Sequence, residues 1–309
     1  MENANKIKET PSAFDVVMGF DMETDIGSFT PFYEGVQKGT PPLLDILKKY
    51  NVPSTFYWTG HAAENNPEMV LKVKNDGHET GCHGLFHETL GDAIFPLPNN
   101  WPILPSEVKG RLTIATKIIE DIIGEKPVSF RCPRLWGSTN VMNVLEELGY
   151  ISDASFPLYF HRKPFVPYHP SSADWTKQGN MKIVEIPNFC DLTMESKDPY
   201  QRDRDQWPLF RTRSAKALMQ KVDSFIDYVQ SHHVRPVVCF YLHPWEFYRM
   251  PQGNLDFGEC SVKPLTFIVK NCGSKALEEF DKLCSMLAEK GARFITAKDV
   301  ALEHSKQTA

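Results

Sequence analysis

The chain has 309 residues, 41% of them hydrophobic and 12% aromatic, enough to bury one substantial core. Its net charge of -5 comes from 34 basic and 39 acidic residues, with no basic run suited to a phosphate backbone, so nucleic acid is not an expected partner. No stretch approaches the roughly 20 apolar residues of a membrane span, and the polar start lacks the apolar core of a secretory signal. We expect a single domain over residues 1–309, with a polar extension at 1–13, in the cytoplasm.

The seven cysteines are irregularly spaced and form no C-x-x-C pair. This pattern does not support a zinc ribbon or a redox motif. We expect most of these cysteines to be reduced, buried small side chains, which agrees with a reducing compartment.

Short apolar runs alternate with amphipathic helices along the chain. Strands are expected at residues 14–20, 54–58, 78–82, 127–131, 181–186, 236–242 and 293–296, with another beginning at residue 151. Helices are expected at residues 42–50, 67–75, 106–123, 140–148, 214–229 and 274–290. This alternation predicts a parallel sheet covered by helices, and periodicity alone leaves both an open doubly wound sheet and a closed barrel.

In parallel architectures, chemistry gathers where strands reach their C-terminal ends. The polar residues expected at such ends are Asp21, Glu23, Asp25, His83, His87, Arg131, Asp153 and His243. These are the side-chain types that hydrolysis requires. Their convergence from separate strands is the main argument for an enzyme, and it does not depend on resemblance to any family.

His83 and His87 stand four residues apart in CHGLFH. One helical turn would place both imidazoles on one face, where they could bind a single cation; two ordinary hydrogen-bonded histidines are the alternative. A third ligand would be a carboxylate from another strand. In an extended FDMETD segment, Asp21 and Glu23 share a face, so that one could hold the metal while the other takes a proton from water. The alternative is a solvated acidic loop.

Three further residues have two interpretations each. Arg131, in FRCPR, either holds a carboxylate base in place or forms a surface salt bridge of little energetic value. His243 precedes Pro244, which cannot donate to a continuing sheet, so it either protonates a leaving nitrogen at a strand end or is a core histidine. Asp153 either orients His243 or caps a turn.

Five motifs then occur in a fixed order: FDMETD (20–25), HGLFH (83–87), FRCP (130–133), GYISDAS (149–155) and YLHPWE (241–246). Together they resemble the polysaccharide deacetylase (NodB-homology, carbohydrate esterase family 4-like) family. The resemblance implies a distorted (β/α) barrel of about seven parallel strands. It also implies a divalent metal, zinc first, on two histidines and a carboxylate, with Asp21 as the base held by Arg131 and His243 as the acid.

One motif departs from the common family pattern. Met22 follows Asp21 where the family usually has a second aspartate, which resembles a branch that contains cytoplasmic peptidoglycan deacetylase and allantoinase-like proteins. Glu23 is therefore the favoured third ligand, with Asp25 in reserve. The departure also leaves the substrate open between a polymer and a small molecule.

The expected function is metal-dependent hydrolysis of a carbon–nitrogen amide bond, with N-deacetylation of an amino sugar first. The alternatives are a small-molecule amidohydrolase acting on a cyclic imide or ureide, and a non-catalytic carbohydrate-binding homologue. Pro133, Trp136 and Trp245 are the predicted substrate contacts, because aromatic faces stack on sugar rings and flat heterocycles; core packing is the alternative for about half of the aromatic residues. The region of the seventh strand and the loop at residues 251–265 are candidate contacts between subunits of a homo-oligomer.

Overall fold

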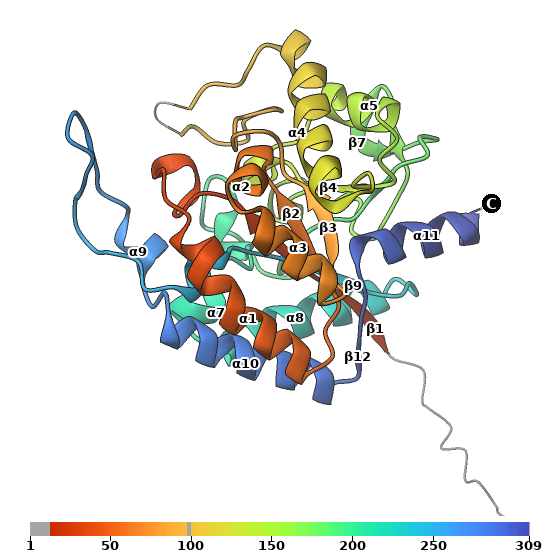
Figure 1. The fold of residues 1–309 in the computed structure, drawn as a ribbon. Coiled ribbons are helices and arrows are strands. Elements are labelled where there is room, and N and C mark those ends of the chain that lie inside the picture. Colours follow the sequence, from red (N-terminus) through yellow and green to blue (C-terminus); the bar gives the residue numbers. More distant parts are fainter. Residues whose placement is uncertain (1–12, 98–99, 309) are drawn as a thin grey trace, which may run out of the picture.

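A computed structural model describes residues 13–97 and 100–308 (Figure 1). The predicted N-terminal extension therefore lies, apart from Ala13, outside the described residues. The architecture is a sheet of parallel strands, curled on itself and surrounded by helices.

The main sheet has eight strands, and each of its strand pairs is parallel. Seven of them follow one another around the barrel: β9 (Val237–Leu242), β1 (Phe14–Met22), β2 (Ser54–Trp58), β3 (Glu79–Cys82), β4 (Ser129–Phe130), β5 (Ser152–Asp153) and β8 (Val184–Glu185). A bridge between Asn188, just past β8, and Cys239 in β9 joins the two ends. The eighth strand, β12 (Ala292–Phe294), pairs with the start of β1. The expected distorted barrel of about seven parallel strands is confirmed.

Strand β1 is buried along its whole length because both of its faces are covered. Alternate residues point outward into the core between barrel and helices: Phe14, Val16, Met18, Phe20 and Met22. Val17 points inward, into a smaller core that fills the barrel together with Ala154, Val184 and Ile186. The same alternation points Asp21 inward at the C-terminal end of the strand.

The helices form the outer layer in chain order (Figure 1). The longer ones are α1 (Thr40–Lys49), α3 (Pro67–Asn75), α4 (Val108–Ile123), α5 (Thr139–Glu147), α8 (Ala215–Gln230), α10 (Ser274–Glu289) and α11 (Ala297–Thr308). Neighbours pack in pairs, such as α3 on α4 and α8 on α10. The first six coincide closely with the helices expected from apolar periodicity.

Several elements were not expected from the sequence. Helix α11 contributes Val300 and Ala301 to the core inside the barrel, although its own residues show only a weak apolar pattern. The aromatic segment after residue 156 also contains short structure that its irregular composition concealed. The additional elements are α2 (Gly60–Asn65), α6 (Leu158–His161), α7 (Leu209–Thr212), α9 (Thr266–Val269), β6 (Pro170–Ser171), β7 (Asp174–Gln178), β10 (Leu255–Asp256), β11 (Ser261–Val262) and the short helical turns η1 (Gly27–Phe29), η2 (Gly35–Gly39), η3 (Pro105–Glu107), η4 (Pro133–Leu135), η5 (Arg202–Arg204) and η6 (Pro244–Phe247).

All seven cysteines are unpaired, and five of them are buried: Cys82, Cys132, Cys190, Cys239 and Cys284. Among residues 13–97 and 100–308, no helix has both the length and the apolar character needed to span a membrane.

Candidate active site

Two acidic side chains meet inside the C-terminal mouth of the barrel. Asp21 is the next-to-last residue of β1, and Glu23 follows it by two residues. Because alternate residues of an extended segment share a face, both side chains point inward. Their exposed fractions are only 4% and 2%. Buried carboxylates require partners, and the partners come from other strand ends.

Asp25, the reserve ligand, faces elsewhere. Its carboxylate accepts hydrogen bonds from the backbone N–H groups of Gly35, at 2.8 Å, and Glu34, at 3.0 Å. Burial raises the pKa of Asp25 to about 7, although the two backbone donors oppose the shift. Asp25 therefore anchors the loop after β1 and takes no part in the cluster that contains Glu23.

Glu23, His83 and His87 form a cluster whose candidate ligand atoms all lie within 4.8 Å of one another. The Glu23 Oε2 atom is 2.5 Å from His87 Nε2 and 3.6 Å from His83 Nε2. The two histidines do not lie on a helical turn, as the four-residue spacing suggested. They lie on an irregular loop in which Gly84 and His87 have φ values of +81° and +61°, and this curvature brings the imidazoles together.

Protonation states in the cluster suit metal binding. His83 Nδ1 is 2.7 Å from the carbonyl oxygen of Arg131, which can only accept, so this nitrogen donates and Nε2 keeps its lone pair. Burial lowers the pKa of His87 to about 4, which keeps its imidazole neutral. The pKa of Glu23 is held well below its usual range, because the neighbouring histidines outweigh the effect of its burial.

The cluster fits a divalent cation on grounds of its own geometry. His83 Nε2 is a buried atom without a hydrogen-bond partner in the described part of the chain, and Glu23 Oε2 is buried with the His87 imidazole at 2.5 Å as its near neighbour. A buried polar atom without a partner lowers the stability of the folded protein unless a bound group satisfies it. Two imidazoles and one carboxylate form the donor set of many three-ligand zinc sites, in which further positions remain open to water.

Arg131 lies one residue beyond β4 and is completely buried. Its guanidinium donates to Asp21 Oδ1 at 2.8 Å and stacks over the Tyr57 ring at 4.4 Å. Space for it comes from Gly19 in β1, where a Cβ atom would collide with the guanidinium. The surface salt bridge considered for Arg131 is therefore wrong, and the residue positions Asp21 from inside the barrel.

His243 follows β9 directly and faces the same two carboxylates. Its Nε2 atom is 3.9 Å from both Asp21 Oδ2 and Glu23 Oε1. Its Nδ1 atom is 2.9 Å from Glu246 Oε1, so the carboxylate that orients His243 is Glu246, in the turn η6. Burial alone would lower the pKa of His243, but the Glu246 hydrogen bond and the nearby acidic groups outweigh it and the net pKa is raised.

Glu246 belongs to a second buried ion pair that the sequence interpretation missed. Its Oε2 atom accepts from Arg211 Nε, and both side chains are completely buried. The Trp207 indole N–H also donates to Glu246, at 3.0 Å. The available signal was the three-residue spacing of His243 and Glu246 in HPWE, which places an acid on the first turn after a strand end.

Asp153 does not orient His243, and this part of the prediction is wrong. Asp153 accepts a hydrogen bond from the Ser155 hydroxyl at 2.6 Å, and Glu185 lies close enough to share a proton with it. Burial, reinforced by the charge of Asp153, raises the pKa of Glu185 well above its usual range. The pair is a buried carboxyl cluster in the barrel wall, because β5 and β8 place Asp153 and Glu185 side by side.

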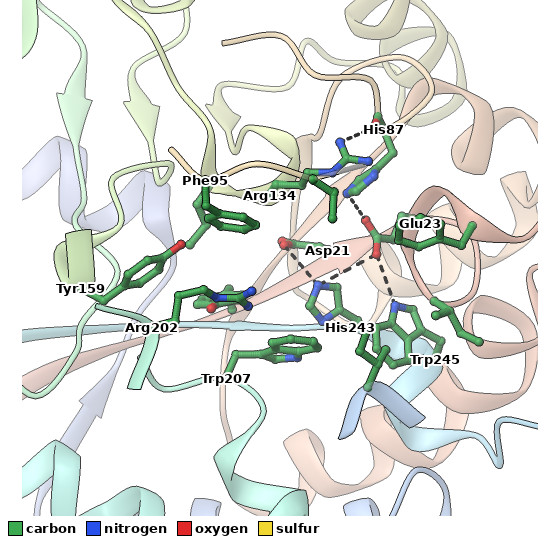
Figure 2. Close-up of a pocket in the computed structure, with 17 residues that line it drawn as sticks. Asp21, Glu23, His87, Phe95, Arg134, Tyr159, Arg202, Trp207, His243 and Trp245 are labelled. Carbon is green, nitrogen blue, oxygen red and sulfur yellow. Dashed lines mark hydrogen bonds and ion pairs between the residues drawn. The ribbon is translucent and has the colours of Figure 1, made fainter. Parts of the chain in front are cut away.

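Asp21, Glu23, His87 and His243 line a cavity of about 170 Å³. Figure 2 shows Asp21 and His243 at its centre, with Glu23, His87 and Trp245 on one side and Phe95, Tyr159, Arg202 and Trp207 on the other. Trp245 lines the cavity, as expected for a substrate contact, and its indole N–H lies 3.3 Å from Glu23 Oε1. The lining is mainly apolar and aromatic, with charged groups at a few fixed places.

Pro133 and Trp136 are buried and do not line this cavity, contrary to prediction. Their neighbours Arg134 and Leu135 line it instead, because both have positive φ values, +61° and +60°, which turn the chain after β4. Trp136 packs behind the wall, edge-on to Phe95 at a centroid distance of 5.0 Å. Two successive non-glycine residues in this conformation indicate strain held at a site, which apolar patterns do not encode.

Part of the chain is similar in sequence to known proteins. Residues 10–152 match the family described as "Polysaccharide deacetylase". A peptidoglycan deacetylase from Helicobacter pylori is 28% identical over 162 residues, 52% of this chain and 46% of the relative. The peptidoglycan-N-acetylmuramic acid deacetylase of Bacillus subtilis is 27% identical over 124 residues, 40% of this chain and 43% of the relative. These alignments thus span less than half the length of either relative.

Solved structures share the fold at low sequence identity. A probable polysaccharide deacetylase from Pseudomonas aeruginosa PAO1 superposes with a TM-score of 0.61 at 14% identity, over 96% of this chain and 92% of the other. An allantoinase superposes with a TM-score of 0.61 at 12% identity, over 94% of this chain and 89% of the other. The resemblance to the polysaccharide deacetylases is confirmed, and the family match covers residues 10–152 of this chain.

Proposed function

We propose that the chain is a metal-dependent hydrolase of carbon–nitrogen amide bonds. The observation that carries the proposal is the meeting of Asp21 and His243 across the cavity floor, 3.9 Å apart, beside the cluster of Glu23, His83 and His87. A proton acceptor and a proton donor on either side of a small space are what amide hydrolysis requires, because one proton leaves water and another reaches the nitrogen.

Glu23, His83 and His87 would hold a divalent ion, and zinc suits two imidazoles and a carboxylate best. When bound, such an ion supplies positive charge that polarises a carbonyl group and makes water more acidic. His83 is prepared for this role by its Nδ1 bond to the Arg131 carbonyl oxygen, which fixes the tautomer and the ring orientation.

Asp21 is the proton acceptor in this scheme. Its Oδ1 atom is bound by Arg131, which holds the carboxylate still, while Oδ2 faces His83 and His243, each at 3.9 Å. A water molecule placed between Asp21 and the substrate carbonyl would give its proton to Oδ2 and attack the carbonyl carbon. The carbon–nitrogen bond then breaks as the nitrogen receives a proton.

His243, which lines the cavity, supplies that proton from Nε2. Glu246 holds the ring through Nδ1, and Arg211 holds Glu246 from behind. The raised pKa of His243 keeps the imidazole protonated to higher pH than a free histidine, as a proton donor requires. The leaving amine can depart once it is protonated.

The first candidate substrate is an N-acetylated amino sugar, since the relatives matched in sequence are named peptidoglycan deacetylases. A small-molecule amide or cyclic imide is the second candidate. The cavity of about 170 Å³ favours it, because pockets for drug-sized ligands are usually roughly 300–1,000 Å³. Comparing hydrolysis of N-acetylglucosamine oligomers with that of cyclic imides separates the two.

The test of the proposed function is metal analysis joined to an activity assay. We expect purified protein to contain about one divalent ion per chain, chelation to abolish hydrolysis, and added zinc to restore it. His83→Ala should lose both the ion and the activity, whereas His232→Ala, at an exposed position after α8, should keep both. A His83→Ala protein that retains its metal and its rate would refute the scheme.

A further inference from the structure

A second charged group faces the cavity, away from the groups proposed for amide hydrolysis. Arg202 lies in the short turn η5, between the barrel strands β8 and β9 in the sequence. It lines the cavity and is half-buried. Figure 2 shows its guanidinium beside Tyr159 and Trp207, on the side opposite Glu23 and His87. The scheme for amide hydrolysis assigns it no part.

The Arg202 guanidinium stacks on the Phe95 ring at 4.7 Å. Across residues 13–97 and 100–308, no carboxylate oxygen lies within 4.0 Å of it. Asp198 accepts from the backbone N–H of Arg202 at 3.2 Å, and Asp205, whose charge interacts with Arg202, is bound to the Tyr241 hydroxyl and to the Gln206 backbone N–H. Asp205 is therefore satisfied by other donors and does not form an ion pair with Arg202.

Arg134, the other cation on the wall, differs in this respect. Its guanidinium donates to the carbonyl oxygen of His87 at 3.0 Å and lies 3.4 Å from the Thr89 hydroxyl. Arg134 thus supports the loop that carries His87. Arg202 is held by stacking, which orients the planar guanidinium but leaves its N–H donors available to a ligand.

The surroundings of Arg202 strengthen its attraction for an anion. Phe95, Tyr159 and Trp207 line this side of the cavity, so a charge here is screened less than on an open surface. A single guanidinium presents a planar pair of donors that matches the two oxygens of a carboxylate. One positive charge also balances one carboxylate, whereas a phosphate would leave negative charge unpaired in an apolar cavity.

We propose that Arg202 binds a carboxylate on the substrate, so that the preferred substrate is an amide or imide that also carries a carboxylate group. The choice of an amide rests on the proposed function. The choice of a carboxylate rests only on the position and surroundings of Arg202. The amide would lie over Asp21 and His243 while the carboxylate reaches Arg202 across the cavity. Arg202 is then a specificity-determining residue of this site.

Direct binding tests the carboxylate without relying on catalysis. Succinamate carries one amide and one carboxylate, and succinamide replaces the carboxylate with a second neutral amide. We would titrate each into zinc-loaded protein and follow binding by calorimetry and by tryptophan fluorescence, because Trp207 and Trp245 line the cavity. We expect succinamate to bind at least about tenfold more tightly, the usual minimum for a hydrogen-bonded charge pair.

Three variants and one further ligand complete the experiment. Arg202→Gln should abolish the preference for succinamate, Arg202→Lys should keep part of it, and Arg213→Gln, at an exposed position outside the cavity, should keep all of it. Unfolding temperatures would show that each variant folds. Inorganic phosphate serves as the competing anion, and tighter binding of phosphate than of succinamate overturns the carboxylate assignment.

Three other results also overturn the proposal. They are equal affinity for succinamate and succinamide, no binding of either compound, and a preference for succinamate that survives in Arg202→Gln. These outcomes are distinct from failure of the proposed function. A protein that prefers succinamate through Arg202 but hydrolyses no amide would refute the hydrolase and retain the anion site. A protein that hydrolyses neutral amides without any carboxylate preference would do the reverse.

Discussion

Two buried arginine–carboxylate pairs flank the cavity and serve it in different ways. Arg131 holds Asp21, whose second oxygen faces the cavity directly. Arg211 holds Glu246, which does not line the cavity and acts on it through His243. Both arginines are completely buried, and each donates to backbone carbonyl oxygens as well as to its carboxylate.

The difference between the pairs follows from what each carboxylate must do. A proton acceptor has to be exposed to the attacking water, so Asp21 stands at the cavity with a single restraint behind it. A proton donor with a pKa near neutrality is best provided by an imidazole, whose charge a carboxylate then stabilises. In the proposed scheme, an arginine–carboxylate pair thus serves once as a reactant, in Asp21, and once as a support, in Glu246.

The largest expected effect is at Asp21. Asp21→Asn retains an oxygen for Arg131 to bind but cannot accept a proton, so amide hydrolysis should fall by about 10²–10⁴-fold. Steady-state kinetics would measure the loss, with metal content by elemental analysis as the control. A variant that retains most of its rate with its metal in place would show that Asp21 is not the base.

A smaller effect, with a characteristic pH dependence, is expected at Glu246. Loss of hydrolysis at high pH should follow deprotonation of His243, whose pKa is raised chiefly by the Glu246 hydrogen bond against the effect of burial. Glu246→Gln removes that support and lowers the pKa of His243. The alkaline limb of kcat/KM should therefore move to lower pH by about 1 pH unit.

The stability of the Glu246→Gln protein is the necessary control, because Arg211 loses its charged partner in the interior. Thermal unfolding would show how much of the population is folded at the assay temperature. An unchanged alkaline limb in folded protein would mean that Glu246 does not tune His243, and the contrast between the two ion pairs would fail.

The smallest effect is expected at Asp153. Its carboxyl group pairs with Ser155 and Glu185 and makes no contact with His243, so Asp153→Asn should leave the alkaline limb in place. We expect kcat/KM to change by less than about threefold, because side chains without shared partners couple weakly. A shift in pH dependence as large as that of Glu246→Gln would restore Asp153 as the residue that orients His243.

Much of the fold and of the central cluster was predictable from the sequence. Asp21, Glu23, His83, Arg131 and His243 each lie at the end of a buried apolar strand or directly after it. A parallel sheet brings such positions to one edge, so local patterns were sufficient to place them near one another. The roles assigned to them remain proposals.

The cavity wall was not predictable in the same way. Arg202 comes from the segment between β8 and α8, which has no clear period, and Trp136 was expected at the cavity but lies behind its wall. Such segments take their path from contacts with the barrel and not from their own propensities.

By itself, the sequence determined the alternation of strands and helices and the order of the acidic, histidine and arginine motifs, because apolar periodicity and strand-end position are local properties. The tertiary structure alone decided that Glu23 and not Asp25 joins the histidines, that Glu246 and not Asp153 supports His243, and that Arg202 faces the cavity. The physical reason is that each of these choices depends on which buried polar group finds a partner across the barrel, and such partners are distant in the chain.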